Sequence, residues 1–278
     1  MAGSHQQNES PGPAAGAPSL PAGGSAQSHI APGARVPASC QIGPFCRIGE
    51  GVELGERCRL DSHVVIEGPA RIGDDNHFFP FSTIGLPPQD LTYRGEPTRL
   101  EIGSHNVVRE FCSLHRGTLK GGGITRIGDH NLLMAYVHVA HDCQVGSHII
   151  MANCATLGGH VEVGDYATVG AFVPVHQFVR IGRYAYIGGG TIVTQDVLPY
   201  SKTSTTRENH AFGANRIGLE RQGLAAERVQ ALQRAFRLLL NSGLNTSQAL
   251  ERLRAEPMTE EVKELAEFIA ASRRGVIK

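Results

Sequence analysis

The sequence contains no tryptophan, and only 6% of its 278 residues are aromatic. Its 26 basic and 26 acidic residues cancel to a formal net charge of zero, which argues against a nucleic-acid-binding protein that relies on bulk positive charge. No apolar run reaches the ~18 residues of a membrane span, so no transmembrane segment is predicted. The six cysteines form no Cys-x-x-Cys pair, which weakens a zinc-finger or thioredoxin-type interpretation.

Apolar residues and glycine are abundant instead. Hydrophobic residues make up 41% of the chain, enough to bury a core, and 34 glycines indicate many turns. A single domain usually holds about 100–200 residues, so one long domain, or one domain with a small partner, is expected. Residues 1–28 are mostly Gly, Ser, Pro, Ala, Gln and Asn, and we expect a disordered tail there because they bury too little apolar surface. They lack the apolar core of a secretory signal.

A six-residue repeat fills the middle of the chain. Aliphatic or other apolar residues recur every sixth position in two phased series, which a break at 115–126 separates by a shift of one residue. The first series is Ile30, Val36, Ile42, Ile48, Leu54, Leu60, Ile66, Ile72, Phe78, Ile84, Ile102, Val108 and Leu114. The second is Ile127, Leu133, Val139, Val145, Met151, Leu157, Val163, Val169, Val175, Ile181, Ile187 and Val193.

A period of six fits neither an amphipathic helix nor an alternating strand, and hexapeptide repeats are typical of parallel β-helices. We therefore predict a mainly β fold, a solenoid over residues 29–200 in which three hexapeptides form one triangular coil. Successive coils would stack at about 4.7–4.9 Å. The cysteines four residues after an aliphatic position are predicted to fill the core: Cys40, Cys46, Cys58, Cys112 and Cys143.

Two segments interrupt the repeat, residues 85–101 and 115–126. A regular solenoid expels insertions onto its surface, where loops carry function. They are either tolerated insertions or loops that build a site.

The C-terminal segment changes period, and residues 201–278 are predicted to form a helical domain. Apolar residues three to four apart in 224–243 indicate an amphipathic helix, with Gly243 as its C-terminal stop. Thr246 or Ser247 can cap a second helix and Thr259 a third. Residues 216–278 contain 11 basic and 8 acidic residues, a net charge of +3, which suits a solvated face or an acidic partner.

Histidines of the second series are the candidate chemical groups. His138, His141 and Asp142 lie within five residues, and His160 and the pair His176 and Gln177 follow. His141 and His160 are 19 residues apart, one coil plus one residue, so they should lie roughly 5–8 Å apart on neighbouring coils at one edge.

Two chemistries could use such a cluster. A histidine near neutral pH can take a proton from a hydroxyl while a carboxylate fixes its tautomer. The backbone N–H of Gly159 could then stabilise an oxyanion. Alternatively, three histidines could bind zinc, as in β-helix carbonic anhydrases. A non-enzymatic binding or structural repeat protein is a third interpretation, in which positions 138, 141 and 160 could be exchanged without loss.

Several stretches together resemble one family, the acyl-[acyl-carrier-protein]–UDP-N-acetylglucosamine O-acyltransferases of lipid A synthesis. They are IGPFCRIG, QDLTYRGEPTRLEIG, LHRGT with GGGITRIGDHNLLM, HVAHDCQVG, LGGHVEVGD and VHQF. The resemblance implies a left-handed parallel β-helix, a homotrimer with sites between subunits, and a cytoplasmic enzyme without metal or cofactor. It implies transfer of a 3-hydroxyacyl chain from acyl carrier protein to the glucosamine 3-position of UDP-GlcNAc.

The resemblance also implies roles for single residues. His141 matches the catalytic base, Asp142 its neighbour and Gly159 the oxyanion donor. The positions that match substrate contacts are Asp90, His138, His160, His176, Gln177, Asn215 and Arg221. Gly189 and Tyr186 lie where the end of an acyl-chain pocket is expected, and acyl carrier protein should meet the basic C-terminal segment.

Three features depart from the family pattern. Thr92 replaces a lysine that contacts phosphate, with Arg94 or Arg99 as candidate substitutes. Ile217 stands where some relatives have an acid, and residues 207–215 look about two residues short. From the sequence, therefore, two acceptors stay open: UDP-GlcNAc and its 3-amino analogue.

Overall fold

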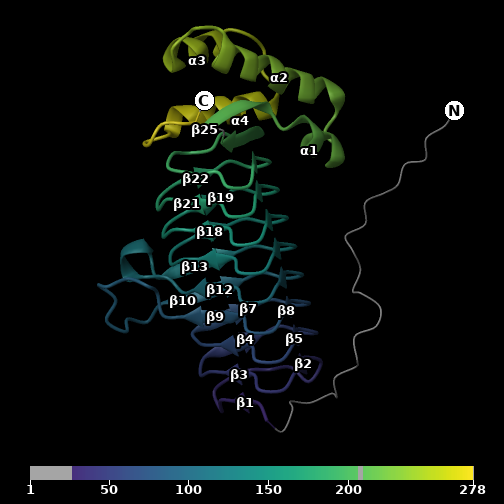
Figure 1. The fold of residues 1–278 in the computed structure, drawn as a ribbon, viewed down its shortest axis with the longest axis vertical. Coiled ribbons are helices and arrows are strands. Elements are labelled where there is room, and N and C mark those ends of the chain that lie inside the picture. The colour runs from purple at the N-terminus through teal and green to yellow at the C-terminus, as the bar shows by residue number, and fades with distance from the viewer. Residues whose placement is uncertain (1–26, 206–208, 278) are drawn as a thin grey trace, which may run out of the picture.

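The computed structural model describes residues 27–205 and 209–277. The chain winds into a solenoid of stacked triangular coils, and a small helical unit covers its C-terminal end (Figure 1). Each side of the triangle is a parallel sheet that takes one short strand from each coil, called here sheets A, B and C. The solenoid is left-handed.

The three sheets run the length of the solenoid. Sheet A contains β1 (His29–Ile30), β3 (Arg47–Ile48), β6 (Val65–Ile66), β9 (Thr83–Leu86), β12 (Ser113–His115), β15 (His138–Val139), β18 (Thr156–Leu157) and β21 (Pro174–Val175). Sheet B contains β4 (Val52–Leu54), β7 (Ala70–Ile72), β10 (Arg99–Ile102), β13 (Ile124–Ile127), β16 (Gln144–Val145), β19 (Glu162–Val163) and β22 (Arg180–Ile181). Sheet C contains β2 (Gln41–Ile42), β5 (Arg59–Leu60), β8 (His77–Phe78), β11 (Val107–Val108), β14 (Leu132–Leu133), β17 (Ile150–Met151), β20 (Thr168–Val169), β23 (Tyr186–Ile187), β24 (Ser201–Thr205) and β25 (Asn209–Ala214).

The predicted repeat is confirmed by the register of these strands. Val139 pairs with Leu157 in sheet A, and Val145 pairs with Val163 in sheet B, each 18 residues further along the chain. From Ile42 onward the repeat residues point inward and bury a continuous apolar column, whereas Ile30 in the first coil is exposed. The five cysteines predicted to fill the core are buried in this column as free thiols. Short strands suffice because each coil packs on its neighbours rather than on itself.

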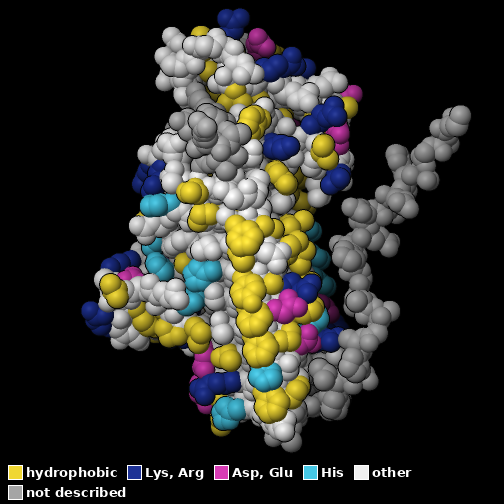
Figure 2. Space-filling view, viewed as in Figure 1, with side chains coloured by type: hydrophobic (Ala, Val, Ile, Leu, Met, Phe, Trp, Pro, Cys, Tyr) yellow, Lys and Arg dark blue, Asp and Glu magenta, His cyan; other side chains and the backbone are white. Residues whose placement is uncertain are grey.

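The corners of the triangle have an unusual backbone. The third residue after a repeat aliphatic has a positive φ at 17 non-glycine positions, for example 62° at Asp142 and 62° at His160. Many of the aromatic residues at these positions are exposed and stack on their counterparts one coil away. Phe111 and Tyr136, at the corner between sheets C and A, lie 4.9 Å apart with nearly parallel rings. Figure 2 shows the resulting hydrophobic column along the solenoid.

The two insertions leave the solenoid at one edge. The first lies between β9 and β10 and the second between β12 and β13, so both leave sheet A and return to sheet B. The second contains a single 3-10 turn, η1 (Leu119–Gly121). The loops project together from the middle of the solenoid (Figure 1). The corner between sheets A and B is therefore the edge at which a site is built.

The C-terminal part begins with strands. β24 is parallel to β23 and turns back as the antiparallel β25, and four helices follow: α1 (Arg216–Arg221), α2 (Ala226–Asn241), α3 (Thr246–Arg254) and α4 (Glu260–Ala271). The expected cap of α3 is wrong, because Asn245 rather than Thr246 or Ser247 forms a capping box with Gln248.

The division into domains stays a prediction, and the expected tail at 1–28 lies almost wholly outside the described residues. Within the described ranges, no helix combines the length and apolar character needed to cross a bilayer.

Candidate active site

His141 and Asp142 form a hydrogen-bonded pair at the corner between sheets A and B. Nδ1 of His141 donates to Oδ2 of Asp142 at 2.8 Å. The side chain of Asp142 is fully buried and that of His141 is 15% exposed. This contact fixes the tautomer of the imidazole and leaves Nε2 as the acceptor nitrogen. The pair thus has the arrangement of a general base and its orienting carboxylate.

The second loop surrounds the Asp142 carboxylate. The N–H and the hydroxyl of Thr118 donate to its two oxygens at 2.7 and 2.6 Å, and the backbone N–H of Asp142 donates to Thr125 Oγ1. Burial of Asp142 acts to raise its pKa, but hydrogen bonds from His141 and Thr118 outweigh burial and leave the pKa below its usual value. Asp142 is therefore ionised beside His141 at neutral pH.

Gly159 and His160 complete this edge one coil further along. The ring of His160 lies edge-on to His141 at 5.2 Å, inside the predicted range, and stacks on Phe178 at 4.4 Å. Burial lowers the pKa of His160, which keeps the ring neutral. A Cβ at position 159 would lie 2.5 Å from His141 Cε1, so only glycine fits under that ring. The Gly159 N–H has no hydrogen-bond acceptor in residues 27–205 and 209–277.

His138 lies on β15 beside a histidine that the sequence analysis did not single out. His115, on β12, meets His138 edge-on at 5.2 Å. Its Nδ1 donates to the carbonyl of Pro87, which ties the first loop to the sheet. His138 Nδ1 accepts from Ser113 Oγ at 2.7 Å, and burial lowers the pKa of His138 to about 4. Burial also lowers the pKa of His115, so both rings are neutral near pH 7 and serve as hydrogen-bonding groups.

Asp90 belongs to the same cluster, at the tip of the first loop. It accepts from the backbone N–H and the hydroxyl of Thr92, both at 2.8 Å. These bonds, with the nearby ammonium of Lys120, hold the pKa of Asp90 below its usual range.

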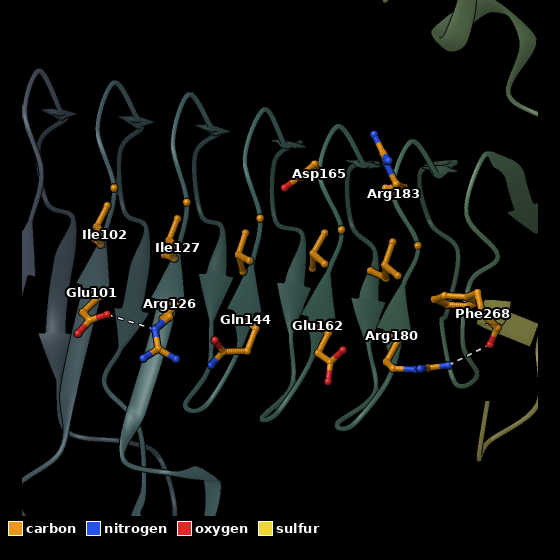
Figure 3. A pocket seen from close by; sticks show the side chains of 18 of the residues that line it. Glu101, Ile102, Arg126, Ile127, Gln144, Glu162, Asp165, Arg180, Arg183 and Phe268 are labelled. Carbon is orange, nitrogen blue, oxygen red and sulfur yellow. Dashed lines mark hydrogen bonds and ion pairs between the residues drawn. The ribbon is translucent and has the colours of Figure 1, made fainter. Parts of the chain in front are cut away.

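A groove runs from this edge across sheet B. A hollow of about 1020 Å³ is lined in part by Asp142, His160 and Arg274. It adjoins a groove of about 880 Å³ between sheet B and α4. Figure 3 shows the floor of that groove, where the outward side chains of sheet B follow one another, and where Arg180 reaches the carbonyl of Phe268. A ligand in the hollow would lie against Asp142 and His160.

Two of the remaining candidates lie at the same corner between sheets A and B, one coil further along. His176 and Gln177 follow β21, exposed, one coil beyond Gly158. Asn215 caps α1 and donates to the carbonyl of Tyr184, at the corner between sheets B and C.

The other positions are also away from His141. Arg221 and Ile217 are exposed on α1, and Tyr186 is partly exposed on β23. Gly189 follows β23 at the corner between sheets C and A. One chain therefore gathers Asp90, His138, His141, Asp142, Gly159 and His160 at one edge, with His176 and Gln177 one coil further along it. Asn215, Arg221, Tyr186 and Gly189 lie on other parts of the molecule.

The donor atoms also test the zinc alternative. One ligand atom each from His141, Asp142 and His160 lie within 4.8 Å of one another. However, the set holds two histidines rather than three, and the Asp142 oxygens already accept from Thr118 and His141. His138 Nδ1 is engaged by Ser113. The donors are arranged for proton transfer rather than for a three-histidine metal site.

The fold and the site together define a hexapeptide-repeat transferase, and the bacterial transferase hexapeptide profile matches residues 124–159. A second profile, described as domain 2 of UDP-N-acetylglucosamine O-acyltransferase, matches residues 196–277.

Two curated relatives bear the name acyl-[acyl-carrier-protein]–UDP-N-acetylglucosamine O-acyltransferase. That from Syntrophobacter fumaroxidans is 50% identical over 78% of this chain and 84% of its own, and that from Thermodesulfovibrio yellowstonii is 46% identical over 90% and 96%. The chain belongs to this acyltransferase family.

Solved structures agree with this assignment. LpxA from Acinetobacter baumannii superposes with a TM-score of 0.88 at 42% identity, over 91% of this chain and 99% of its own. LpxA from Bacteroides fragilis, a UDP-N-acetylglucosamine acyltransferase, gives a TM-score of 0.89 at 37% identity over the same shares.

Proposed function

We propose that the protein transfers a 3-hydroxyacyl chain from acyl carrier protein to the 3-hydroxyl of the glucosamine in UDP-GlcNAc, the first step of lipid A synthesis. The observation that carries the chemistry is the His141–Asp142 contact of 2.8 Å, beside a hollow that Asp142 and His160 help to line. The acceptor and donor are those in the names of the relatives.

The geometry supports a direct transfer. Nε2 of His141 takes the proton from the acceptor hydroxyl as its oxygen attacks the thioester carbonyl, and Asp142 stabilises the imidazolium that forms. The Gly159 N–H donates to the oxyanion of the tetrahedral intermediate. When the carbon–sulfur bond breaks, the imidazolium returns its proton to the thiol of the carrier. The products are the acylated acceptor and the free carrier thiol, and no covalent enzyme intermediate forms.

The active unit in this proposal is a homotrimer. The His141 pair lies at the corner between sheets A and B, whereas Asn215 lies between B and C and Gly189 between C and A. A threefold axis parallel to the solenoid would bring different edges of neighbouring copies together. Light scattering should then give about three times the 29.7 kDa of one chain. A monomer with full activity would contradict the trimer.

Acyl carrier protein is the proposed partner of the C-terminal part, whose sequence from 216 to 278 carries a net charge of +3. An acidic carrier would be attracted to it, and added salt should raise the KM for the carrier. A cytoplasmic location accords with a carrier-protein donor.

The direct test is a transfer assay with a panel of 3-hydroxyacyl carrier proteins, each offered UDP-GlcNAc or its 3-amino analogue. Mass spectrometry of the products identifies both the chain and the new bond. An ester formed on UDP-GlcNAc is expected. An amide alone would move the acceptor to the amine, and no product with either acceptor would refute the proposal.

A further inference from the structure

Thr92 and Lys120 come from different loops and meet above the site. The ammonium of Lys120 donates to the hydroxyl of Thr92 at 2.8 Å, and that hydroxyl donates in turn to Asp90. Thr92 carries no charge of its own. Lys120, from the second loop, therefore brings a positive charge to this point above the site.

The backbone around Lys120 is held by the site itself. Lys120 is the middle residue of η1, and the cap of this turn, Thr118, is bound to the Asp142 carboxylate. A Cβ at Gly121 would lie 2.1 Å from Cγ of Asp142, so the turn rests directly on that carboxylate. The position of Lys120 is thus fixed relative to His141, although its side chain is exposed.

The other cations of the two loops are directed elsewhere. Arg94 donates to the carbonyls of Leu91 and Tyr93 in its own loop, and Arg99 pairs with Glu101 on sheet B. Arg116 donates to the carbonyl of Gly68 beneath the first loop. Neither Arg94 nor Arg99, the two candidate substitutes, reaches Thr92.

The acceptor makes a cation necessary here. Its diphosphate would enter a site that already holds the ionised carboxylates of Asp90 and Asp142. The negative charges of the diphosphate and of these carboxylates repel one another. We propose that the Lys120 ammonium binds the diphosphate of the nucleotide-sugar acceptor and is the phosphate-binding cation of this site. This assignment rests on the proposed function. The contact with a neutral hydroxyl leaves two further N–H donors of the ammonium for phosphate oxygens.

Lys120→Gln tests this assignment because glutamine keeps the length and polarity of the side chain but not its charge. A hydrogen bond to a charged group is usually worth about 1.5–3 kcal/mol, so we expect about a tenfold or larger rise in the KM for UDP-GlcNAc. The dissociation constant of UDP alone, measured by calorimetry, should rise by a similar factor. The KM for acyl carrier protein should not change. Arg35→Gln, in the first coil and 80% exposed, is the matched control for loss of a surface charge.

The double variant Thr92→Lys with Lys120→Gln moves the positive charge from position 120 to position 92, the other partner in the contact between these two residues. It should restore UDP affinity to within about threefold of the wild type, since both side chains reach one point. Unchanged UDP binding in Lys120→Gln, or a rise only in the KM for the carrier, would overturn the assignment. Failure of the wild type itself to acylate UDP-GlcNAc would refute the proposed function instead, and UDP binding would still report on Lys120.

Discussion

Thr118 and Asp142 are 24 residues apart in the sequence, yet the N–H and the hydroxyl of Thr118 bind both oxygens of the Asp142 carboxylate. The carboxylate that orients His141 is therefore held by a loop rather than by the solenoid. This loop therefore helps to position the His141 ring through Asp142. The ordering of the loop and the ionisation of Asp142 are also coupled.

Thr118→Val removes the hydroxyl and leaves a buried carboxylate oxygen without that donor. Because bonds to charged groups contribute about 1.5–3 kcal/mol, we expect the free energy of unfolding to fall by this amount and kcat to fall by about tenfold. Denaturant titration and steady-state kinetics measure the two effects. Thr118→Ser keeps the hydroxyl and should restore both. A serine variant as impaired as the valine variant would show that the methyl group, not the bond, matters.

His141→Ala should lose at least about 100-fold in kcat, the scale of a lost general base. The fold should persist because the ring packs at the surface edge rather than in the core, and the thermal midpoint and oligomeric state should stay close to those of the wild type. His63→Ala, in the exposed ring column between Phe45 and Phe81, is the control and should keep its activity. Near wild-type turnover in His141→Ala would refute the base assignment.

Gly159→Ala should act through the neighbouring ring. The added methyl would lie 2.5 Å from His141 Cε1, so the imidazole must tilt away from both the acceptor and Asp142. We expect kcat to fall by about 100-fold, with the KM for UDP-GlcNAc changed little. A crystal structure of the variant would show the displaced ring. If the ring is unmoved and kcat is normal, the close approach does not position the base.

His138 gives the protein a defined dependence of stability on pH. Burial, with the nearby imidazoles of His115 and His141, lowers its pKa from 6.5 to about 4. Between these values the unfolded chain binds a proton that the folded chain does not, so stability falls as the pH falls from 6.5 towards about 4. His138→Asn should flatten this part of the curve. Thermal midpoints of the two proteins across the window provide the measurement, and parallel curves would contradict the prediction.

Much of this architecture could be predicted from the sequence because the solenoid follows one local rule. A spacing of 19 residues placed His141 and His160 on adjacent coils at one edge, and their rings lie 5.2 Å apart. The buried cysteines follow from the same rule. Each inference needed only the coil length of 18 residues, which the register confirms.

The loops could not be placed in this way because they break the repeat. Nothing in the spacing of Thr118, Lys120 or Thr92 says which residues they meet, since an insertion has no register with the neighbouring coil. The HRGT stretch was a signal that the second loop matters, but not that Thr118 binds Asp142. The chemistry of the candidate base was therefore predictable, whereas its loop support was not.

The edge between sheets A and B is where this molecule can gain or lose residues. Both loops leave and return at this corner, and the coils beyond them keep their register. Residues can be added or removed here without rotating any later strand. A single residue added inside a strand would instead turn every following side chain of that strand from core to solvent. The solenoid thus confines changes of length to the edge where ligands bind, so that specificity can vary while the core remains the same.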